Sequence, residues 1–572
     1  MTIFGVLAHS NAAQAALRNQ KVQSLASSFP RDRKSWWIDP RGRAALFGAA
    51  VIGRLAIAVD SFQTINPGLF KNIAQVDGDF AIASWDTSHG RLTLARDHFG
   101  QKQLYLSRRE DLSLFCSDLG PLLEDRGWPR AMDFESAINY LRRGLPLRGR
   151  TLAKGIESVP AAHALLWKPP APPVVQRYWT PLLCHSAPPT EQGIKSVLDN
   201  AIRSRLAPKS NALLLSGGVD SSYIAVKAAS KKPLTSYTIA YDPRYKKNED
   251  HFAADVAHRI GGQHVIVSIN AKQAYSILQD VLKAPVPCSA WAAIIHQRLV
   301  ARVSKRNEKT LLSGLGADEL FGGYDRYLDY YFQQREFARR WKKSETIDWF
   351  DALLDTDDEA TTRLFPGIAS FFSPRELKRW LYQPFAKCGL NDFDREFYRE
   401  CRRLKPNAQI FEMMIAHECQ HRIPDLLMTN FEPVAKKMEV PASYPFLDRA
   451  LATQAVLLRP AERYWYENGA WWAKKFFRQI ASEVLPESIV MRRRATYEPP
   501  IVEWFQEPEF GPATVERFAS SSLWDTGFLR PALKDNLIKL IRKLPDSYYT
   551  NRLWLEEFWA VLTLGAWFDR YI

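Results

Sequence analysis

The sequence has few cysteines and no long hydrophobic run. Its six cysteines are spread over 572 residues, and no two of them form a C-x-x-C pair. This spacing excludes a zinc knuckle and a disulfide scaffold and is typical of a reducing compartment, so we expect a cytoplasmic protein. The best apolar segment, Leu46–Val59, is interrupted by Arg54 and falls short of the ~18 residues of a membrane-spanning helix. The first residues, MTIFGVLAHSN, lack the basic region and cleavage site of a secretory signal.

The charge balance is basic but dilute. There are 77 lysines and arginines against 62 acidic residues, which gives a formal net charge of +15 at pH 7. Spread over this length, the excess favours acidic partners, but it does not indicate nucleic-acid binding. Hydrophobic residues make up 46% of the chain and charged residues 24%, as in ordinary globular proteins. The length allows about two to four domains.

A proline-rich stretch divides the chain. Residues 168–173 read Lys-Pro-Pro-Ala-Pro-Pro, which a helix cannot cross. We therefore predict a first domain over residues 1–167, a linker over 168–188 and a second domain over 189–572. In the first domain, short apolar runs separated by turn residues predict the strands Ala44–Val51, Asp79–Trp85, Leu92–Ala95, Gln103–Leu106 and Ala164–Trp167.

The second domain begins with alternating strands and helices. Ala212–Leu215, Ser236–Tyr241 and Gln263–Val267 are predicted strands, and Phe252–Ile260 is a predicted helix. Strands and helices in this alternation indicate a parallel sheet that is covered by helices. From about residue 325 onward the periodicity is mostly helical.

One segment of this domain has the features of a phosphate-binding loop. Leu213–Ser222 reads LLLSGGVDSS. Its two glycines let backbone N–H groups approach a ligand, and the following helix presents its positive end. The serines add hydroxyl donors, and Asp220 is placed to hold Mg²⁺. No Gly-Lys-Ser/Thr follows, so we infer a site for pyrophosphate and not a Walker loop. An ordinary capped turn would account for Ser-Gly-Gly alone, whereas the whole segment favours the nucleotide site.

A second glycine-rich turn follows about a hundred residues later. Leu311–Tyr324 reads LLSGLGADELFGGY, in which Asp318 and Glu319 are placed to face a bound cation. The carboxyl ends of parallel strands lie at one edge of a sheet, where nucleotides bind. The alternative is a coincidental turn with surface acids. Two such turns in one chain favour a nucleotide–Mg²⁺ site at this edge.

These segments resemble the asparagine synthetase family. Asp77–Asp86, Leu94–Lys102, Tyr444–Asp448 and the stretch from Lys474 to Arg494 are also similar to that family. The resemblance implies an α+β N-terminal glutaminase-like (Ntn-type) sandwich. An α/β ATP-pyrophosphatase domain with a parallel sheet and a mostly helical C-terminal part would follow. The implied chemistry is adenylation of a carboxylate by ATP, release of pyrophosphate and attack by an amine.

The resemblance also assigns residues to the site. Asp220 and Asp318 would share Mg²⁺, and Asp318 would also be catalytic. The family's lysine near the pyrophosphate falls on Arg494, a second catalytic candidate that keeps the charge but cannot donate a proton near neutral pH. The ATP-binding residues would be Leu215, Ser216, Gly217, Gly218, Val219, Asp220, Ser221, Ser222, Ile239, Ser313 and Gly314.

Three departures from the family pattern concern the nitrogen source. In register with Ile3–Gly5, Met1 occupies the position of the glutaminase cysteine and Thr2 the next one. The Asn-Gly-Glu segment that holds glutamine in the family is missing from residues 56–76, and Leu315 replaces an acid in the second turn. We therefore expect an inactive glutaminase and an acceptor pocket unlike one for ammonia and aspartate.

An amine carried by the substrate would remove the need for ammonia, since tethering gives effective molarities of roughly 10⁵ M or more. Family members with this pattern, the β-lactam synthetases and the lasso peptide cyclases, close rings. We expect a lasso peptide cyclase that acts on a precursor peptide, with a leader-binding protein and a peptidase as partners. Two alternatives stay open. One is an amidotransferase of antibiotic or glycan biosynthesis that uses ammonia, and the other is a tRNA-modifying PP-loop enzyme, although paired cysteines are missing.

Aromatic and basic residues in the C-terminal half offer a surface for such a peptide. For any single tryptophan, packing in the helical core is the simpler interpretation. The residues are Trp341, Trp349, Trp380, Trp465, Trp471, Trp472 and Trp504, interleaved with Arg339, Arg340, Arg463 and Arg478.

Overall fold

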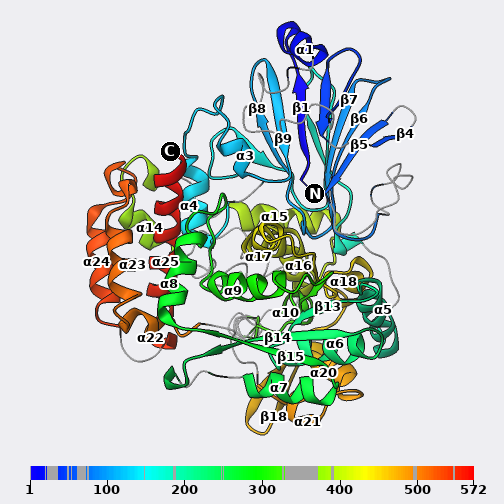
Figure 1. Ribbon diagram of the computed structural model, residues 1–572, viewed down its shortest axis with the longest axis vertical. Coiled ribbons are helices and arrows are strands. Elements are labelled where there is room, and N and C mark those ends of the chain that lie inside the picture. The colour runs from blue at the N-terminus through cyan, green and yellow to red at the C-terminus, as the bar shows by residue number, and fades with distance from the viewer. Residues whose placement is uncertain are drawn as a thin grey trace.

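The protein consists of an N-terminal β-rich domain and a larger α/β domain, which lie on top of one another (Figure 1). The computed structural model describes residues 2–19, 21, 36–47, 50–52, 55–60, 73, 76–146, 149–183, 188–245, 248, 250–324, 327–328, 371–387, 392–493, 499–544 and 548–572. The arrangement confirms the predicted fold class, an α+β sandwich followed by a parallel-sheet domain with a mostly helical C-terminal part.

Two six-stranded antiparallel sheets pack face to face in the N-terminal domain. The first has the order β10 (Ile156–Ser158), β8 (Tyr105–Arg108), β9 (Leu112–Cys116), β1 (Phe4–Ala8), β3 (Ala44–Phe47) and β2 (Trp36–Ile38). The second has the order β12 (Val174–Arg177), β11 (His163–Trp167), β7 (Arg91–Arg96), β6 (Ala81–Asp86), β5 (Leu55–Asp60) and β4 (Ala50–Ile52). Alternate residues point inward, and the core between the sheets includes Leu7, Leu46, Leu94, Leu106 and Phe115. Among its described residues, this domain also has the helices α1 (Asn11–Arg18), α3 (Gly120–Leu123) and α4 (Phe134–Arg143).

The predicted single strand Ala44–Val51 is wrong, because the segment contributes to both sheets. Ala44–Phe47 pairs with β1 in the first sheet, and Ala50–Ile52 pairs with β5 in the second. Both pieces have the apolar composition of a strand, so the sequence pattern does not show the crossing between them. The other strands predicted for this domain correspond to β6, β7, β8 and β11, with ends that shift by about two residues or fewer.

The proline-rich stretch forms a turn between two strands of the same sheet. Strand β12 follows it and pairs with β11, which places His163 opposite Arg177. Within the turn, Trp167 Nε1 donates a hydrogen bond to the carbonyl oxygen of Ala171 at 2.9 Å. Part of the predicted linker, residues 174–177, therefore belongs to the N-terminal sheet. Proline content alone marks the turn but not the strand that returns from it.

A five-stranded parallel sheet forms the centre of the second domain. Its order is β15 (Gln263–Ile269), β14 (Leu234–Tyr241), β13 (Asn211–Leu214), β16 (Leu311–Leu312) and β17 (Ala442–Ser443). Leu213 of β13 pairs with Ser236 on one side and Leu312 on the other. The ends of β13 and β16 therefore lie side by side. The helices of this part are α5 (Glu191–Ser204), α6 (Val219–Ala229), α7 (Asp250–Arg259), α8 (Ala271–Val281), α9 (Ala292–Ser304) and α10 (Ala317–Phe321).

The C-terminal part is mostly helical, as predicted, and its central feature is one long helix. This helix runs through α16 (Ile410–His417), the π-helix η7 (Glu418–Leu427) and α17 (Met428–Lys437). A hairpin of β18 (Tyr464–Glu467) and β19 (Ala470–Ala473), which was not predicted, leads into α20 (Lys475–Ser482). The other helices are α14 (Pro374–Trp380), α15 (Asp392–Leu404), α18 (Arg449–Ala455), α19 (Pro460–Arg463), α21 (Glu487–Val490), α22 (Ile501–Gln506), α23 (Gly511–Ala519), α24 (Pro531–Ile541) and α25 (Tyr548–Tyr571).

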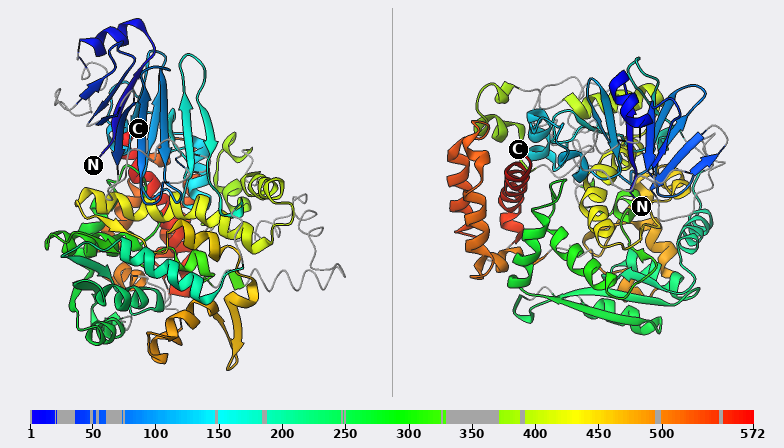
Figure 2. Two further views of the ribbon diagram at one scale, coloured as in Figure 1. Left: turned by 90° about the vertical axis from the view of Figure 1, so that its right-hand side faces the viewer. Right: turned by 45° about the horizontal axis from the view of Figure 1, so that its top comes forward.

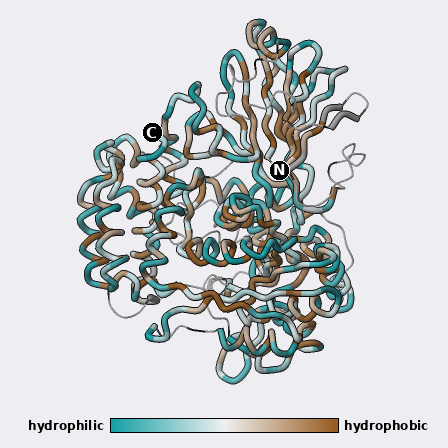
Figure 3. The backbone as a smooth tube through the Cα atoms, viewed as in Figure 1, coloured by the Kyte–Doolittle hydropathy of each residue, from teal (hydrophilic) through white to brown (hydrophobic). Residues whose placement is uncertain are grey.

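Helices α22 to α25 pack at the side of this body (Figure 2), and α25 contacts α4 of the N-terminal domain through a hydrogen bond between Thr563 and Tyr140. Hydrophobic residues concentrate along the strands and on parts of the helices, which otherwise carry hydrophilic residues (Figure 3). No helix in the described part of the chain is long and apolar enough to cross a membrane. The cysteines for which the structure gives a side chain are buried and form no disulfide with one another, namely Cys116, Cys288, Cys401 and Cys419.

Candidate active site

The first loop of the site connects β13 to α6. Gly217 has a φ of 71°, and a Cβ there would lie 2.6 Å from Cβ of Phe252, so glycine is required. Ser216 Oγ lies 3.1 Å from Oγ of Ser221 and accepts a hydrogen bond from the backbone N–H of Gly218 at 3.3 Å. The loop is therefore ordered by its own serines, with the N-terminus of an 11-residue helix directly behind it. Such an end attracts anions.

The second loop connects β16 to α10 and touches the first. The backbone N–H of Ser313 donates to the carbonyl oxygen of Ser443 on β17 at 3.1 Å. A Cβ on Gly314 would lie 3.3 Å from Cβ of Asp220, so the two loops are in close contact. Leu315, the residue that departs from the family pattern, is partly buried against the hydrophobic core.

The side chain of Lys474 joins the two loops. Its Nζ atom donates hydrogen bonds to Oδ1 and Oδ2 of Asp220 at 2.8 and 2.6 Å and lies 2.7 Å from Oδ1 of Asp318. The lysine side chain is 5% exposed, and each aspartate side chain is 22% exposed. Two carboxylates from different strand ends therefore face one buried positive charge at the carboxyl edge of the sheet.

Burial and the two carboxylates set the charges of this cluster. Burial raises the pKa of Asp220; the charge of Lys474 opposes this increase, and that of Asp318 adds to it. Burial by itself would lower the pKa of Lys474, but the charges of Asp220 and Asp318 outweigh it and raise that pKa. Lys474 therefore carries its proton at neutral pH.

The backbone around Lys474 is shaped to bring its ammonium to the loops. Lys474 adopts a left-handed conformation, with φ 61° and ψ 35°, directly before α20. Non-glycine residues in this conformation cost about 1–3 kcal/mol and cluster at functional sites. Gly323 leaves the necessary space, because a Cβ there would overlap Oδ1 of Asp318 and Cε of Lys474.

The carboxylates of Asp220 and Asp318 fit a magnesium ion. Mg²⁺ is commonly held by one or two carboxylates, while water and substrate phosphates fill its other positions. The Lys474 ammonium shows that both carboxylates can reach one cation. Among the described residues there is no group of three or more His, Cys, Asp or Glu side chains that could hold a metal ion. The described residues therefore offer Mg²⁺ two carboxylate ligands, and the phosphate oxygens of a substrate would supply others.

The structure brings the predicted nucleotide-binding residues to neighbouring strand ends. Leu215–Gly218 form the turn after β13, Val219–Ser222 form the first turn of α6, and Ser313 and Gly314 follow β16. Ile239 lies near the carboxyl end of β14, the next strand of the sheet. Arg494 lies outside the described residues. The binding roles of all these residues stay predictions.

Lys474 is the candidate that sequence analysis did not single out. It lies 254 residues from Asp220 in the sequence, and its stretch contains several basic residues. Only the fold shows which of them reaches the two loops. The position of Lys474 directly before an amphipathic helix, within a segment similar to the family, is the signal that the sequence offers.

The predicted aromatic and basic surface is only partly present. Trp504 is fully buried in the core, and Arg463 and Arg478 are buried too. Arg463 donates hydrogen bonds to the carbonyl oxygens of Leu458, Leu320 and Ala455, and Arg478 donates to those of Ala473 and Arg492. These arginines therefore stabilise the fold. Four of the predicted residues lie outside the described part of the chain, namely Trp341, Trp349, Arg339 and Arg340.

The hairpin β18–β19 keeps an exposed aromatic pair. Tyr466 and Trp471 lie opposite each other on the two strands, with ring centroids 5.4 Å apart. They are 60% and 38% exposed. The second strand of this hairpin ends at Ala473, directly before Lys474.

Two family models match the chain, in agreement with an amidotransferase-type sandwich joined to a parallel-sheet domain with paired loops. The asparagine synthase model matches residues 193–569, and the glutamine amidotransferase domain model matches residues 66–179. The first match covers well over half of the sequence. The chain belongs to the asparagine synthase family.

Curated relatives are similar over part of their length. A putative glutamine-hydrolyzing asparagine synthetase of Mycobacterium tuberculosis is 29% identical over 270 residues, which are 45% of this chain and 41% of the relative. The glutamine-hydrolyzing asparagine synthetase 3 of Bacillus subtilis is 28% identical over 276 residues, 44% of each chain. Amidase chyE of Penicillium rubens is 26% identical over 280 residues, 45% of this chain and 41% of the relative. The chain spans less than half the length of these relatives.

Proposed function

We propose that this protein is an ATP-dependent, AMP-forming amide ligase that adenylates a carboxylate and joins it to an amine. The observation that carries the proposal is the shared contact of Asp220 and Asp318 with Lys474, at the edge where β13 and β16 end. The Leu215–Gly218 turn and the start of α6 supply backbone N–H groups that suit a pyrophosphate. Membership of the asparagine synthase family supports ATP as the nucleotide.

Each side chain has a role in the proposed reaction. Asp220 and Asp318 hold Mg²⁺, which when bound neutralises charge on the phosphates. The loop N–H groups and the hydroxyls of Ser216 and Ser221 bind the pyrophosphate. Lys474 and Arg494 supply positive charge where negative charge develops on the leaving group.

The bonds made and broken are those of two successive substitutions. A substrate carboxylate oxygen bonds to the α-phosphorus of ATP as the bond to pyrophosphate breaks. The amine nitrogen then bonds to the acyl carbon, AMP leaves with the oxygen, and the amine loses a proton.

We further propose that the amine belongs to the substrate itself. Three sequence features support this proposal. Met1 and Thr2 stand at the positions of the glutaminase cysteine and its neighbour, the Asn-Gly-Glu segment is missing from residues 56–76, and Leu315 replaces an acid. An N-terminal domain without glutaminase activity delivers no ammonia, and a tethered amine reacts at a high effective concentration.

A lasso precursor peptide is our lead substrate, with a leader-binding protein and a peptidase as proposed partners. In this reaction an Asp or Glu side chain of the peptide is adenylated and the N-terminal amine of the same peptide closes the ring. The exposed Tyr466 and Trp471, on the hairpin that runs into Lys474, offer a surface for such a chain. The alternative is an amidotransferase that uses ammonia. The names of the Mycobacterium and Bacillus relatives, which are glutamine-hydrolyzing asparagine synthetases, support amide formation from ammonia but name glutamine as its source.

Product analysis separates these proposals. The full chain is incubated with ATP and Mg²⁺, either with ammonium and free aspartate or with a peptide encoded beside its gene. The ligase proposal expects pyrophosphate and AMP, and the cyclase proposal expects a peptide lighter by one water. Robust asparagine formation would exclude the cyclase, and the absence of ATP–pyrophosphate exchange in every mixture would exclude the ligase.

A second assay tests the N-terminal domain. Glutamate release from glutamine is expected to be absent in the wild type, and Thr2→Ala is expected to leave amide formation unchanged. Glutamine hydrolysis that Thr2→Ala abolishes would contradict an inactive glutaminase.

A further inference from the structure

The segment Arg96–Lys102 of the N-terminal domain forms a compact turn around one buried carboxylate. Asp97 is fully buried, and it accepts hydrogen bonds from the backbone N–H groups of Phe99, Gln101 and Lys102 at 3.0, 3.0 and 2.9 Å. The Asp97 carboxylate therefore stabilises the backbone conformation of its own segment. The turn is then rigid enough to carry the side chains at its two ends to the second domain.

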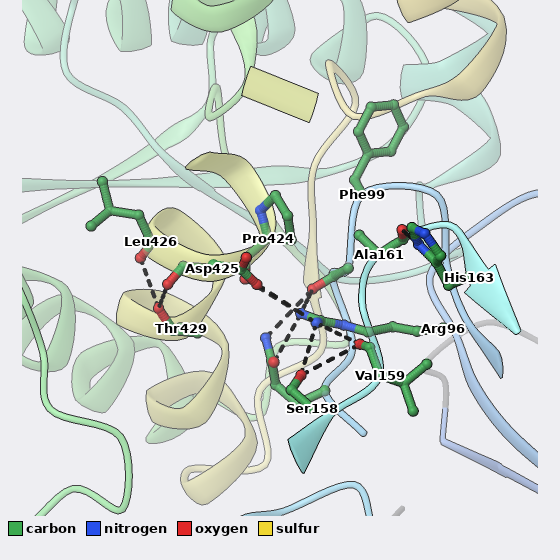
Figure 4. Close-up of polar contacts among 12 residues, drawn as sticks. Arg96, Phe99, Ser158, Val159, Ala161, His163, Pro424, Asp425, Leu426 and Thr429 are labelled. Atoms are coloured by element: carbon green, nitrogen blue, oxygen red, sulfur yellow. Dashed lines mark hydrogen bonds and ion pairs between the residues drawn. The ribbon is translucent and has the colours of Figure 1, made fainter. Parts of the chain in front are cut away.

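At one end of the turn, Arg96 binds the π-helix η7. Its guanidinium is fully buried, donates to the carbonyl oxygen of Pro424 at 3.3 Å and lies 3.9 Å from Oδ1 of Asp425 (Figure 4). It also donates to the carbonyl oxygens of Gly100 and Lys102 at 2.8 and 2.6 Å. Gly100, with a φ of 58°, permits this approach, because a Cβ there would lie 2.6 Å from Cβ of Pro424.

Two residues before Pro424, the same π-helix contacts the second loop of the candidate active site through Arg422. Arg422 Nη1 donates to Glu319 at 2.8 Å and to Glu418 at 3.4 Å, and its guanidinium lies 4.6 Å from the ring centroid of Tyr324. Glu319 directly follows Asp318 in α10 and also accepts a hydrogen bond from Tyr324. π-helical segments are rare in proteins, and those that occur often lie at functional sites.

At the other end of the turn, Lys102 reaches α17, and through Glu432 it is linked to the residue after β17. Its Nζ atom donates to Glu432 on α17 at 2.8 Å, and Tyr444 donates to the other oxygen of the same carboxylate at 2.6 Å. Tyr444 follows Ser443, the residue of β17 whose carbonyl accepts from Ser313. Both ends of the turn are thus connected by short polar contacts to the two sides of the second loop.

We propose that the Arg96–Lys102 turn is a positioning element for the ligase site, and that it acts through Arg422 on Glu319 and through Tyr444 on Ser313. The proposal rests on the proposed function, since it needs Asp318 to hold Mg²⁺. The amidotransferase-type domain then has a use that does not depend on glutamine. Its turn fixes the π-helix, and the π-helix sets the carboxylate of Asp318 relative to that of Asp220.

The test separates the magnesium-dependent part of nucleotide binding from the rest. Binding of adenosine 5′-(α,β-methylene)triphosphate to the full chain is measured by calorimetry, in Mg²⁺ and in EDTA. For Arg96→Gln we expect the tightening by Mg²⁺ to fall about tenfold, while binding in EDTA stays unchanged. The matched control is Arg43→Gln in the same domain, where Arg43 pairs with Asp39 at 2.9 Å and donates to the carbonyl oxygen of Thr87 at 2.8 Å, both within that domain. It should change neither value.

Two further variants keep the test decisive. If Arg96 acts through Glu319, Arg96→Gln and Glu319→Gln weaken the same contact. The double variant should then lose about tenfold of the tightening by Mg²⁺, and not a hundredfold. Tyr444→Phe removes one hydroxyl and is expected to weaken binding about threefold in both conditions, since its path ends at Ser313. If Arg96→Gln does not fold, Tyr444→Phe still tests the positioning role of the Arg96–Lys102 turn.

The outcomes distinguish the two proposals. A wild type that does not bind the analogue with Mg²⁺ overturns the proposed function. A wild type that binds it, together with Arg96→Gln and Tyr444→Phe proteins that bind it equally well, overturns the positioning role alone. Losses that multiply in the Arg96→Gln, Glu319→Gln double variant also contradict the proposed path.

Discussion

Lys474 and Asp220 lie 254 residues apart in the sequence, yet the Nζ atom of Lys474 donates hydrogen bonds to both carboxylate oxygens of Asp220, at 2.8 and 2.6 Å. The same ammonium lies 2.7 Å from Asp318, which belongs to the other loop. This lysine therefore makes one site from two separate segments. The functional account depends on this site more than on any other part of the molecule.

Neutralising either aspartate should remove ligase activity and leave the fold intact. We expect Asp220→Asn and Asp318→Asn each to lower ATP–pyrophosphate exchange by roughly 10²-fold or more, because each removes a charge of the proposed Mg²⁺ site. Thermal unfolding should show folded proteins. Asp280→Asn, on an exposed residue of α8 that pairs with Lys283, is the control. Exchange at the wild-type rate in either site variant would contradict the assignment.

Removing the Lys474 ammonium should make the protein depend on Mg²⁺ for stability. In Lys474→Met two largely buried carboxylates face each other without a cation, which should cost about 3 kcal/mol of the free energy of unfolding. Mg²⁺ should restore part of it. We therefore expect the Tm of this variant to rise with Mg²⁺ more than the Tm of the wild type. An equal response of the two proteins would show that the carboxylates do not bind the ion together.

The space beside the ion cluster should tolerate no added methyl group. Gly323→Ala places a Cβ against Asp318 and the Lys474 side chain, so we expect ATP–pyrophosphate exchange to fall about tenfold or more. Gly120→Ala is the matched control, since its Cβ would meet its nearest atom, Cγ of Pro285, at an ordinary 3.4 Å. If the two alanine variants are equally active, the packing argument is wrong.

The stability of the protein should depend on pH through Asp425, which lies at the interface between the domains. Burial raises the pKa of Asp425 to about 7, and the charge of Arg96 opposes this increase. Between pH 4 and pH 7 the folded protein keeps a proton that the unfolded chain releases, so the free energy of unfolding falls as pH rises. Asp425→Asn should remove this dependence, a difference on the order of 1–4 kcal/mol. Denaturant unfolding of both proteins across this range provides the measurement, and parallel curves would contradict the shift.

Sequence analysis succeeded where chemistry is local. The strand, the two glycines and Asp220 lie within ten residues of one another, as do the strand, the glycines and Asp318 of the second loop. The alternation of strands and helices was enough to bring these loops to one edge of a parallel sheet. These features could be predicted because each depends on neighbours in the sequence.

The failures concern contacts between distant segments. The arrival of Lys474 at the loops depends on a left-handed residue after the unpredicted hairpin β18–β19. The burial of Arg463 depends on carbonyl oxygens contributed by α10 and by the segment of α18 and the turn that follows it. A basic residue among aromatic ones looks like a surface in the sequence, and only packing shows that it is buried. The split of the Ala44–Val51 run between two sheets has the same cause.

The central claim is that the two loops bind magnesium and ATP together, and a crystal structure of the full chain with Mg²⁺ and a non-cleavable ATP analogue tests it most directly. The account predicts the triphosphate in the Leu215–Gly218 turn, the metal ion on both Asp220 and Asp318, and the Lys474 ammonium moved from the carboxylates to a phosphate oxygen. A nucleotide bound elsewhere, or a metal ion that contacts neither aspartate, would contradict it.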